Sequence, residues 1–319
     1  MPLTRCLSQF NLFRLEEPSS PTSAAEIKET QKALDQLFTL TKQYRSSTAY
    51  QELLSFVGRF RFYSPYNAML VHVQLPGATF VASAARWLTK YSRRIKTVSR
   101  PIVILQPKGP VMFVFDVSDT EGEGDAPALP RDVTHPFETR SGNVGTELEA
   151  TIENAKRDGI RIHKHSAGSQ SAGSIIGVQV EAFQDVVTRR MPRQELTSVP
   201  VRYDLQLNAE LSREAQYVTL LHELAHLYCG HLGTPDSTWW PSRMSLPLNC
   251  REFEAESVCY ILCKRMGIDN PSEAYLHDYL EQTGQVPPIS LEIVMAAAGV
   301  IERMGRERLP IRKPGPKPS

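Results

Sequence analysis

The sequence lacks a long hydrophobic run, a secretion signal and a cysteine framework. No apolar stretch approaches the roughly 20 residues that a membrane-spanning helix needs, so we expect no membrane contact. The opening segment MPLTRCLSQFNLFRLEEP has no sustained apolar region, so we expect no secretory signal. Five cysteines in 319 residues are an odd number and do not indicate a set of disulfides. We therefore expect a cytoplasmic protein.

The chain also has almost no net charge, at +1, but its charges are distributed unevenly. Residues 51–110 contain nine Lys or Arg residues and a single acid, Glu52, whereas residues 116–158 contain eleven acids and four bases. A concentration of positive charge is typical of a surface that binds polyanions. With 41% hydrophobic and 22% charged residues, the chain is predicted to be globular rather than disordered.

The order of apolar repeats and turn residues predicts an α+β protein with two domains. Five parts are expected: a flexible leader over 1–23, a first domain over 24–117, an acidic Gly/Pro-rich linker over 118–145, a second domain over 146–308, and a basic tail over 309–319.

Within these parts the patterns predict individual elements. The first domain should contain amphipathic helices between Ala24 and Phe62 that break near Ser46, helices over 65–74 and 82–91, and a hairpin of strands over 101–107 and 111–117. The second should contain a helix over 146–158, strands over 160–163, 175–181 and 201–207, helices over 212–230 and 251–266, and a closing helical pair.

The sharpest motif is the sequence His222-Glu223-Leu224-Ala225-His226. Residues four apart share one face of a helix, so both imidazoles should point to the same place with Glu223 beside them. This spacing is typical of two nitrogen ligands to Zn²⁺ with a carboxylate near the metal. We predict that His222 and His226 bind zinc and that Glu223 is the general base of a hydrolase.

A catalytic zinc ion usually has three protein ligands, so a third is required. Glu252 lies 26 residues after His226 and is predicted to be that ligand; Glu256, four residues further on, is predicted to orient a ligand histidine, and remains the alternative third ligand. Glu254 is expected to point elsewhere, into solvent. His231 is out of register with the three-histidine zincin pattern.

Two further expectations concern the surroundings of this motif. Tyr228 and His231 are both candidates to donate a hydrogen bond to the oxyanion of the reaction. The strand over 201–207, just before the motif, is a candidate edge to which a peptide substrate could add as an extra strand.

Residues 56–96 interleave cations with aromatic rings, a combination that suits single-stranded nucleic acid. The predicted phosphate contacts are Arg59, Arg61, Arg93, Arg94 and Lys96, and the predicted stacking rings are Tyr63 and Tyr66. Phe56, Phe60 and Trp87 are expected to be core residues instead. Cys259 and Cys263 are expected to be small buried side chains.

Two segments resemble a known family, the ArdC-like antirestriction proteins. They are GRFRFYSPYNAMLVHVQLPGATFVASAARWLTKYSRRIKTVSRPIVILQP, and HELAHLYCGH followed by REFEAESVCYILCKRMGI, which also resembles the ImmA/IrrE group. The resemblance covers about residues 25–115 and 145–270. It implies single-stranded-DNA binding by the first domain and a gluzincin-like metallopeptidase domain with His222, His226 and a downstream glutamate as ligands. It also implies a plasmid setting, where such proteins shield DNA from restriction.

Two hypotheses from different classes follow. In the first, the protein is a zinc metallopeptidase whose DNA-binding domain directs it to a protein substrate. In the second, it is a DNA-shielding protein whose zinc site is structural or regulatory. Glu223 favours the first, because a structural site needs no general base and is usually closed by four ligands.

Overall fold

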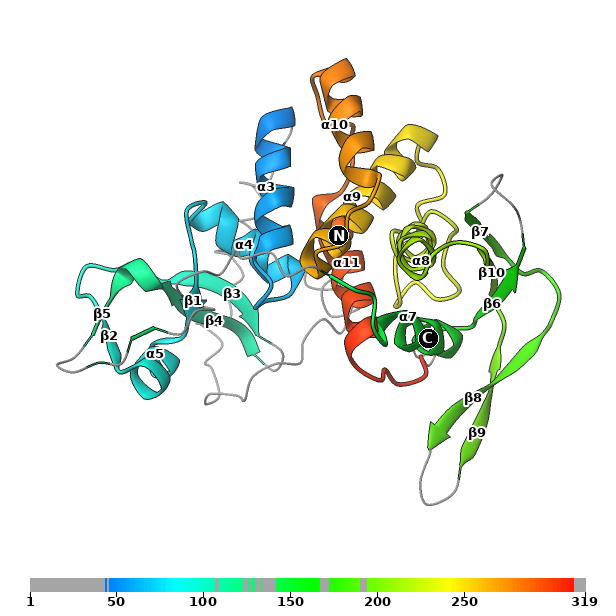
Figure 1. Cartoon of the computed structure of the whole chain (residues 1–319), viewed down its shortest axis with the longest axis horizontal. Coiled ribbons are helices and arrows are strands. Elements are labelled where there is room, and N and C mark those ends of the chain that lie inside the picture. The colour runs from blue at the N-terminus through cyan, green and yellow to red at the C-terminus, as the bar shows by residue number, and fades with distance from the viewer. Residues whose placement is uncertain are drawn as a thin grey trace, which may run out of the picture. The chain divides into compact units, whose positions relative to one another are not determined.

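The structure, a computed structural model, describes residues 44, 46–106, 109–122, 126, 128–129, 133, 142–166, 172–189 and 194–312. It is a mixed α+β protein (Figure 1) whose described residues divide into two compact units. The N-terminal unit comprises the described residues up to 133 together with Leu280–Val286, and the C-terminal unit comprises the others. The predicted leader 1–23, the predicted helix before Ser46 and residues 313–319 of the predicted tail lie outside the described residues.

The N-terminal unit combines three helices with short strands. Two sheets have the strand orders β1-β4-β3 and β2-β5, and all of their pairings are antiparallel. In chain order the elements are α3 (Ser47–Arg59), α4 (Pro65–Gln74), β1 (Val81–Ala82), α5 (Ala84–Tyr91), β2 (Arg93–Ile95), β3 (Ile102–Gln106), β4 (Gly109–Asp116), a 3₁₀ turn (Val117–Asp119) and β5 (Thr120–Gly122).

Serine caps fix where these helices begin. The side chains of Ser46, Ser64 and Ser83 accept hydrogen bonds from the first turns of α3, α4 and α5. The break predicted near Ser46 is therefore an N-cap, and the predicted helix over 65–74 is confirmed at both ends. The predicted hairpin is also confirmed, since β3 and β4 pair directly.

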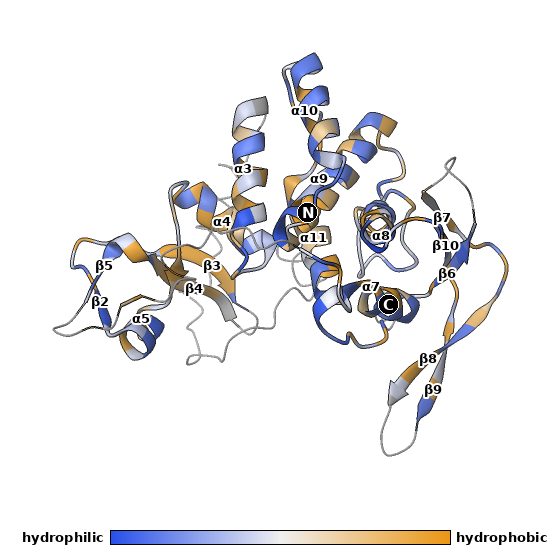
Figure 2. Ribbon diagram, in the orientation of Figure 1, coloured by the Kyte–Doolittle hydropathy of each residue, from blue (hydrophilic) through white to orange (hydrophobic). Residues whose placement is uncertain are grey.

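Helix α4 is attached to β3 by side-chain amides. Asn67 donates to the carbonyl of Leu105 and accepts from its amide, at 3.1 and 3.0 Å. Gln74, two turns later, does the same with Val103, at 2.8 and 2.9 Å. These paired bonds hold α4 against the hydrophobic strand β3 (Figure 2). They also supply partners for backbone amides and carbonyls at the edge of β3 that no described strand pairs.

The predicted linker over 118–145 does not begin where the sequence suggested. Residues 120–122 form β5 and pair with β2. Val133 is 3% exposed and packs in a cluster with Phe80, Trp87 and Tyr91. Acidic, Gly-rich composition predicted a linker, but residues 120–122 and Val133 belong to the packed part of the unit.

The C-terminal unit packs helices beside a three-stranded sheet. Its elements are α7 (Glu147–Arg157), β6 (Ile160–His165), β7 (Gly173–Gly177), β8 (Phe183–Arg189), β9 (Glu195–Pro200), β10 (Tyr203–Asn208), α8 (Arg213–Tyr228), α9 (Leu248–Met266), α10 (Ser272–Thr283) and α11 (Leu291–Arg306). Helix α11, which is largely hydrophobic (Figure 2), contacts α7, α8 and α9. The predicted helices over 146–158, 212–230 and 251–266 are confirmed within a few residues.

The sheet corrects the prediction that strand 201–207 is a free edge. β10 lies in the centre of the order β6-β10-β7, parallel to β6 and antiparallel to β7. Both of its edges are already paired, so it cannot accept an added strand. The hairpin of β8 and β9 was not predicted, because β9 is mostly exposed and lacks clear apolar alternation. No helix in the described ranges has the length and hydrophobicity needed to cross a membrane.

Candidate metal centre

Helix α8 carries the His-Glu-x-x-His motif in its second half. Ser212 caps the helix by accepting from the amide of Ala215, and the apolar side chains Leu220, Leu221, Leu224 and Leu227 are fully buried. This buried stripe fixes the rotation of α8 and turns the two histidines toward α9. The Nε2 atoms of His222 and His226 are 3.1 Å apart.

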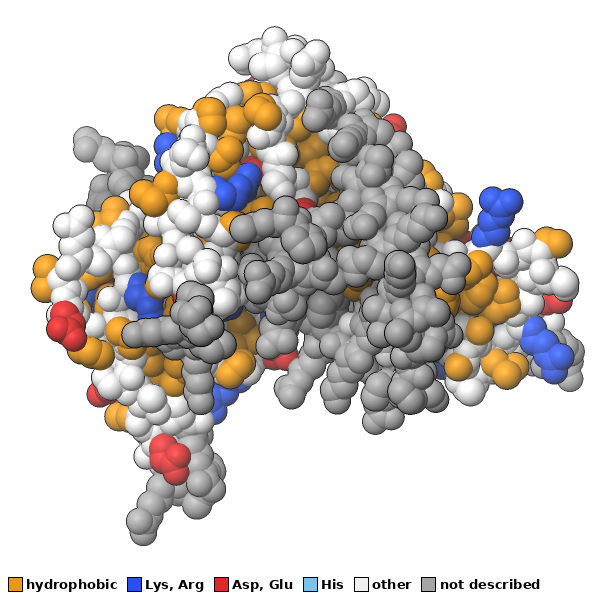
Figure 3. All heavy atoms as spheres, turned by 180° about the vertical axis from the view of Figure 1, so that it is seen from behind, with side chains coloured by type: hydrophobic (Ala, Val, Ile, Leu, Met, Phe, Trp, Pro, Cys, Tyr) orange, Lys and Arg blue, Asp and Glu red, His pale blue; other side chains and the backbone are white. Residues whose placement is uncertain are grey.

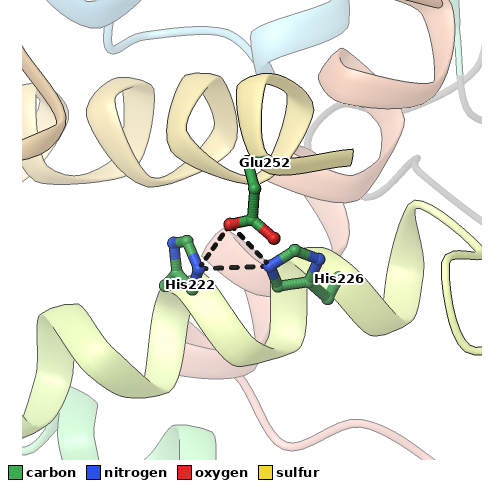
Figure 4. A group of neighbouring side chains, drawn as sticks. All are labelled: His222, His226 and Glu252. Carbon is green, nitrogen blue, oxygen red and sulfur yellow. Dashed lines mark hydrogen bonds and ion pairs between the residues drawn. The ribbon is translucent and has the colours of Figure 1, made fainter. Parts of the chain in front are cut away.

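Helix α9 supplies the predicted carboxylates. Figure 4 shows Glu252 reaching from α9 toward both histidines of α8. One oxygen of Glu252, Oε2, lies 3.7 Å from His222 Nε2 and 3.5 Å from His226 Nε2. Glu256 faces the other nitrogen of His222, with Oε1 3.4 Å from Nδ1. The two glutamates therefore occupy different positions. Glu252 lies close to the Nε2 atoms of both histidines, whereas Glu256 lies close to Nδ1 on the opposite side of the His222 ring.

The donor set of His222, His226 and Glu252 fits a zinc ion. Their three ligand atoms lie within 4.8 Å of one another. In a tetrahedral zinc site, neighbouring donor atoms lie about 3.3 Å apart. The distances of 3.1, 3.5 and 3.7 Å are close to this value. Two imidazoles and one carboxylate leave a fourth position open, as catalytic zinc sites do.

Glu223 lies on the same helix between the two histidines. Burial raises the pKa of this carboxyl above its ordinary value, and the nearby Glu252 raises it further, while His226 and a hydrogen bond from the Ile175 backbone act in the opposite direction. Ile175 belongs to β7, which lies at an edge of the sheet. A half-buried carboxylate beside two imidazoles is a candidate general base.

Glu254 contradicts the expectation that it points into solvent. Its side chain is 0% exposed and accepts hydrogen bonds from His231 at 2.9 Å and from Arg243 at 2.6 and 2.7 Å. Burial alone would raise the pKa of Glu254, but these hydrogen bonds hold it below its ordinary value. The spacing along α9 placed Glu254 away from Glu252 correctly, yet the far side of this helix is protein rather than water.

His231 and Tyr228 have different positions from those expected for oxyanion donors. The Nδ1 atom of His231 lies 3.0 Å from Nδ1 of His226, whereas Glu252 lies at the opposite ring nitrogen, Nε2. The hydroxyl of Tyr228 is fully buried and donates to Asp158 at 2.8 Å, so it is not available to a substrate. Sequence spacing missed the role of His231, because Arg243 and Glu254, which position it, are distant in sequence.

Three of the five cations that are predicted to contact DNA phosphates are exposed. Arg59, Arg94 and Lys96 are exposed, and Arg61 is half-buried. The guanidinium of Arg93 donates to the hydroxyl and carbonyl of Thr120, which fixes it on the pair of strands β2 and β5. On the face drawn in Figure 3, the described Lys and Arg side chains are scattered rather than gathered in one patch.

The two predicted stacking tyrosines differ. Tyr66 is 0% exposed within α4, so the prediction that its ring stacks on a base is wrong for this conformation. Tyr63 is half-buried and donates its hydroxyl to the carbonyl of Val81 at 3.1 Å, which leaves part of its ring accessible. As expected, Phe56, Phe60 and Trp87 are core residues, at 1%, 1% and 0% exposed. Cys259 and Cys263 are likewise buried and carry free thiols.

No protein-family model matches the chain. The chain is 25% identical over 310 residues to an uncharacterized protein of Bacillus anthracis; the match covers 80% of this chain and 47% of the relative, so the chain spans about half the length of that protein. The crystal structure of the metal-free antirestriction ArdC protein from plasmid R388 matches with a TM-score of 0.31 and 13% identity, over 76% of this chain and 82% of that one. These values do not assign the chain to a family.

Proposed function

We propose that the C-terminal unit is a zinc-dependent hydrolase that cleaves peptide bonds. The observation that carries this proposal is the convergence of His222, His226 and Glu252 on one point, with Glu223 beside them. A site with three ligands and a neighbouring carboxylate has the parts of a catalytic centre, whereas a structural zinc site is usually closed by four ligands.

The chain's own residues account for the proton transfers of this reaction. A bound zinc ion would supply Lewis-acid activation of the scissile carbonyl and of water. Glu223 accepts a proton from the attacking water as the new carbon–oxygen bond forms, and it returns that proton to the leaving nitrogen as the carbon–nitrogen bond breaks.

The experiment that tests this proposal separates metal binding from hydrolysis. Zinc is titrated into the chelator-treated protein, and the loaded protein is then incubated with a mixed peptide library whose products are identified by mass spectrometry. We expect one zinc ion per chain and cleavage that stops on chelation. Stoichiometric zinc binding with no cleavage of any peptide or denatured protein would contradict hydrolysis and favour a structural or regulatory ion.

We further propose that the N-terminal unit binds single-stranded DNA. The supporting observation is the exposure of Arg59, Arg94 and Lys96 in a segment with a large excess of basic residues. A role in protecting DNA from restriction is proposed from the sequence resemblance alone. Titration of a labelled oligonucleotide at several salt concentrations, with and without chelator, tests DNA binding: we expect salt-sensitive binding that survives chelation, and no binding under either condition would contradict it.

A further inference from the structure

Glu254 is the most completely satisfied carboxylate near the metal centre. Its Oε2 atom accepts from Nε2 of His231 at 2.9 Å and from Arg243 at 2.6 Å. Its Oε1 atom accepts from the second Arg243 nitrogen at 2.7 Å and from the backbone amide of Ser290 at 2.8 Å. The side chain of Glu254 is fully buried. Its hydrogen-bond partners come from three separate places in the chain, at His231, Arg243 and Ser290.

The path from Glu254 to the metal ligands passes through one imidazole. His231 is 2% exposed, and its two ring nitrogens face Glu254 on one side and Nδ1 of His226 on the other, at 2.9 and 3.0 Å. The opposite nitrogen of His226, Nε2, is the one that faces Glu252. A continuous line of contacts therefore runs from Arg243 through Glu254 and His231 to the zinc-facing atom of His226.

Hydrogen-bond chemistry gives this line a direction. An ionised carboxylate can only accept, so Nε2 of His231 must carry the proton that it donates to Glu254. In neutral His231, Nδ1 then has a lone pair and must accept from Nδ1–H of His226. His226 is consequently left with a lone pair on Nε2, the atom that faces Glu252 and His222. The acceptor-only character of Glu254 thus selects the tautomer of His226 that can bind a metal through Nε2.

The backbone explains how His231 returns to a residue five positions earlier. Gly230 follows α8 with a φ of +80°, a backbone conformation that residues other than glycine rarely adopt. A Cβ atom at Gly230 would lie 2.0 Å from the carbonyl oxygen of Pro241. The turn allows the amide of His231 to donate to the carbonyl of His226 at 3.0 Å, which brings the two rings together.

We propose that Glu254 and His231 are positioning residues that fix His226 in its metal-binding tautomer and orientation. This inference rests on the metal-binding part of the proposed function and adds a second set of residues that determines zinc affinity. Partners of this kind on ligand histidines typically change metal affinity by about 10- to 100-fold. His222 has its own partner of this type in Glu256.

The same cluster has a competing interpretation as a second metal site. A thiol, an imidazole and a carboxylate from Cys229, His231 and Glu254 lie close enough together to hold an ion. However, both oxygens of Glu254 already accept from Arg243, whose positive charge also opposes a cation there. Burial also raises the pKa of the Cys229 thiol, which disfavours the thiolate that a metal requires. We therefore expect one zinc ion per chain.

Glu254→Gln is the decisive variant, because it is nearly isosteric. The NH2 group of glutamine, placed where Oε2 of Glu254 lies, can donate to Nε2 of His231, so that the two imidazole hydrogen bonds reverse and a proton is placed on Nε2 of His226. Arg243 can only donate, and its bond keeps its direction toward the glutamine carbonyl. We expect zinc affinity, measured by competition with a chromophoric chelator, to fall about 10- to 100-fold. In the metal-free full chain labelled with ¹⁵N-histidine, NMR should show His226 shifting from its Nδ1–H to its Nε2–H form.

A second variant and a control complete the test. His231→Gln keeps a donor to Glu254 but has no polar atom at the position of Nδ1, which accepts from His226, so it should lower zinc affinity to a similar extent. Ser257→Ala, which removes a buried hydrogen bond within the same helix α9, should leave zinc affinity unchanged. If Glu254→Gln does not fold, His231→Gln decides the question through the same two measurements.

The outcomes separate this inference from the proposed function. Zinc affinity within about twofold of wild type in a folded Glu254→Gln or His231→Gln protein would overturn the positioning role, since the expected losses are tenfold or more. Binding of two zinc ions, with one lost in Cys229→Ala, would overturn it as well. Zinc binding without peptide cleavage would overturn only the proposed hydrolysis and leave the positioning role intact.

Discussion

The two units differ in how many charged side chains they bury and pair. In the C-terminal unit, charged groups are drawn inside and paired: Glu254 with Arg243, and Arg265 with Glu302 at 2.6 Å, while His222, His226 and Glu252 converge. In the N-terminal unit, Arg59, Arg94 and Lys96 lie at exposed positions, and the described interior is mostly apolar, with His72 and Asp116 among the buried exceptions.

This difference has a physical origin. A buried charge is tolerated only when hydrogen bonds and an opposite charge replace its lost hydration, so buried charges in the C-terminal unit have precise partners. An exposed cation keeps most of its hydration, so its stability depends less on any single partner; Lys96 donates to the carbonyl of Ser118 and still lies at an exposed position. Substitutions of buried charges in the C-terminal unit should therefore cause large losses of activity or stability. Substitutions of the exposed cations in the N-terminal unit should cause only small losses of DNA affinity.

The largest expected effect concerns Glu223. We expect Glu223→Gln to lower peptide hydrolysis by about 100- to 10,000-fold, because it removes the general base. Zinc stoichiometry should not change, since Glu223 is not among the three converging ligands. Product formation per bound zinc, measured by mass spectrometry, is the readout. Full activity in this variant would show that another group moves the proton.

The next effect concerns the buried pair of Arg243 and Glu254. Arg243→Met leaves a carboxylate with 0% exposure without its charge partner, and we expect a loss of about 3–5 kcal/mol in the free energy of unfolding. The matched control is Lys156→Met, because Lys156 forms a partly exposed pair with Glu153 on α7. That change should cost at most about 0.5 kcal/mol. Urea unfolding of both variants compares them, and equal losses would contradict the contrast between buried and exposed charges.

A buried histidine provides an intermediate effect in the N-terminal unit. Burial, with a contribution from Arg59, lowers the pKa of His72 from 6.5 to about 4. The unfolded chain therefore binds a proton that the folded unit excludes between pH 6.5 and about 4, and stability is lost as the pH falls through this window, by about 3 kcal/mol.

This contribution to the pH dependence should disappear in His72→Phe. The ring centroids of His72 and Phe56 are 4.8 Å apart, so a phenylalanine ring at position 72 can pack beside Phe56. Urea unfolding at pH 7.5 and pH 5 measures the difference for wild type and variant. His163→Gln, at a half-exposed position, is the control and should keep the wild-type dependence. An unchanged slope in His72→Phe would assign the effect to another group.

The smallest effect concerns the exposed cations. We expect Arg94→Glu to weaken binding of single-stranded DNA modestly and to reduce the slope of log affinity against log salt by about 1. Lys164→Glu, an exposed basic position on β6 of the other unit, is the matched control and should leave the slope unchanged. Fluorescence anisotropy at three salt concentrations measures both. Equal slopes in wild type and Arg94→Glu would remove Arg94 from the proposed interface.

Local features of the sequence predicted local features of the structure well. Helix α4 begins at the predicted proline, and the break before α3 is the predicted serine, because capping and proline geometry act within a few residues. The spacing of His222 and His226, and of Glu252 and Glu256, predicted shared helix faces for the same reason. Predictions that required a partner from elsewhere were less successful, as Tyr66, β10 and residues 120–122 show.

The sequence by itself thus determined which residues of α8 and α9 would face in a common direction, since helical periodicity depends only on spacing. Tertiary structure alone decided that Glu252 approaches both Nε2 atoms while Glu256 lies behind His222. It also decided that Glu254 is buried against His231 and Arg243. The physical reason is that a hydrogen-bonded network joins segments whose separation in the chain carries no periodic signal, so its partners are selected only when the helices and turns pack together.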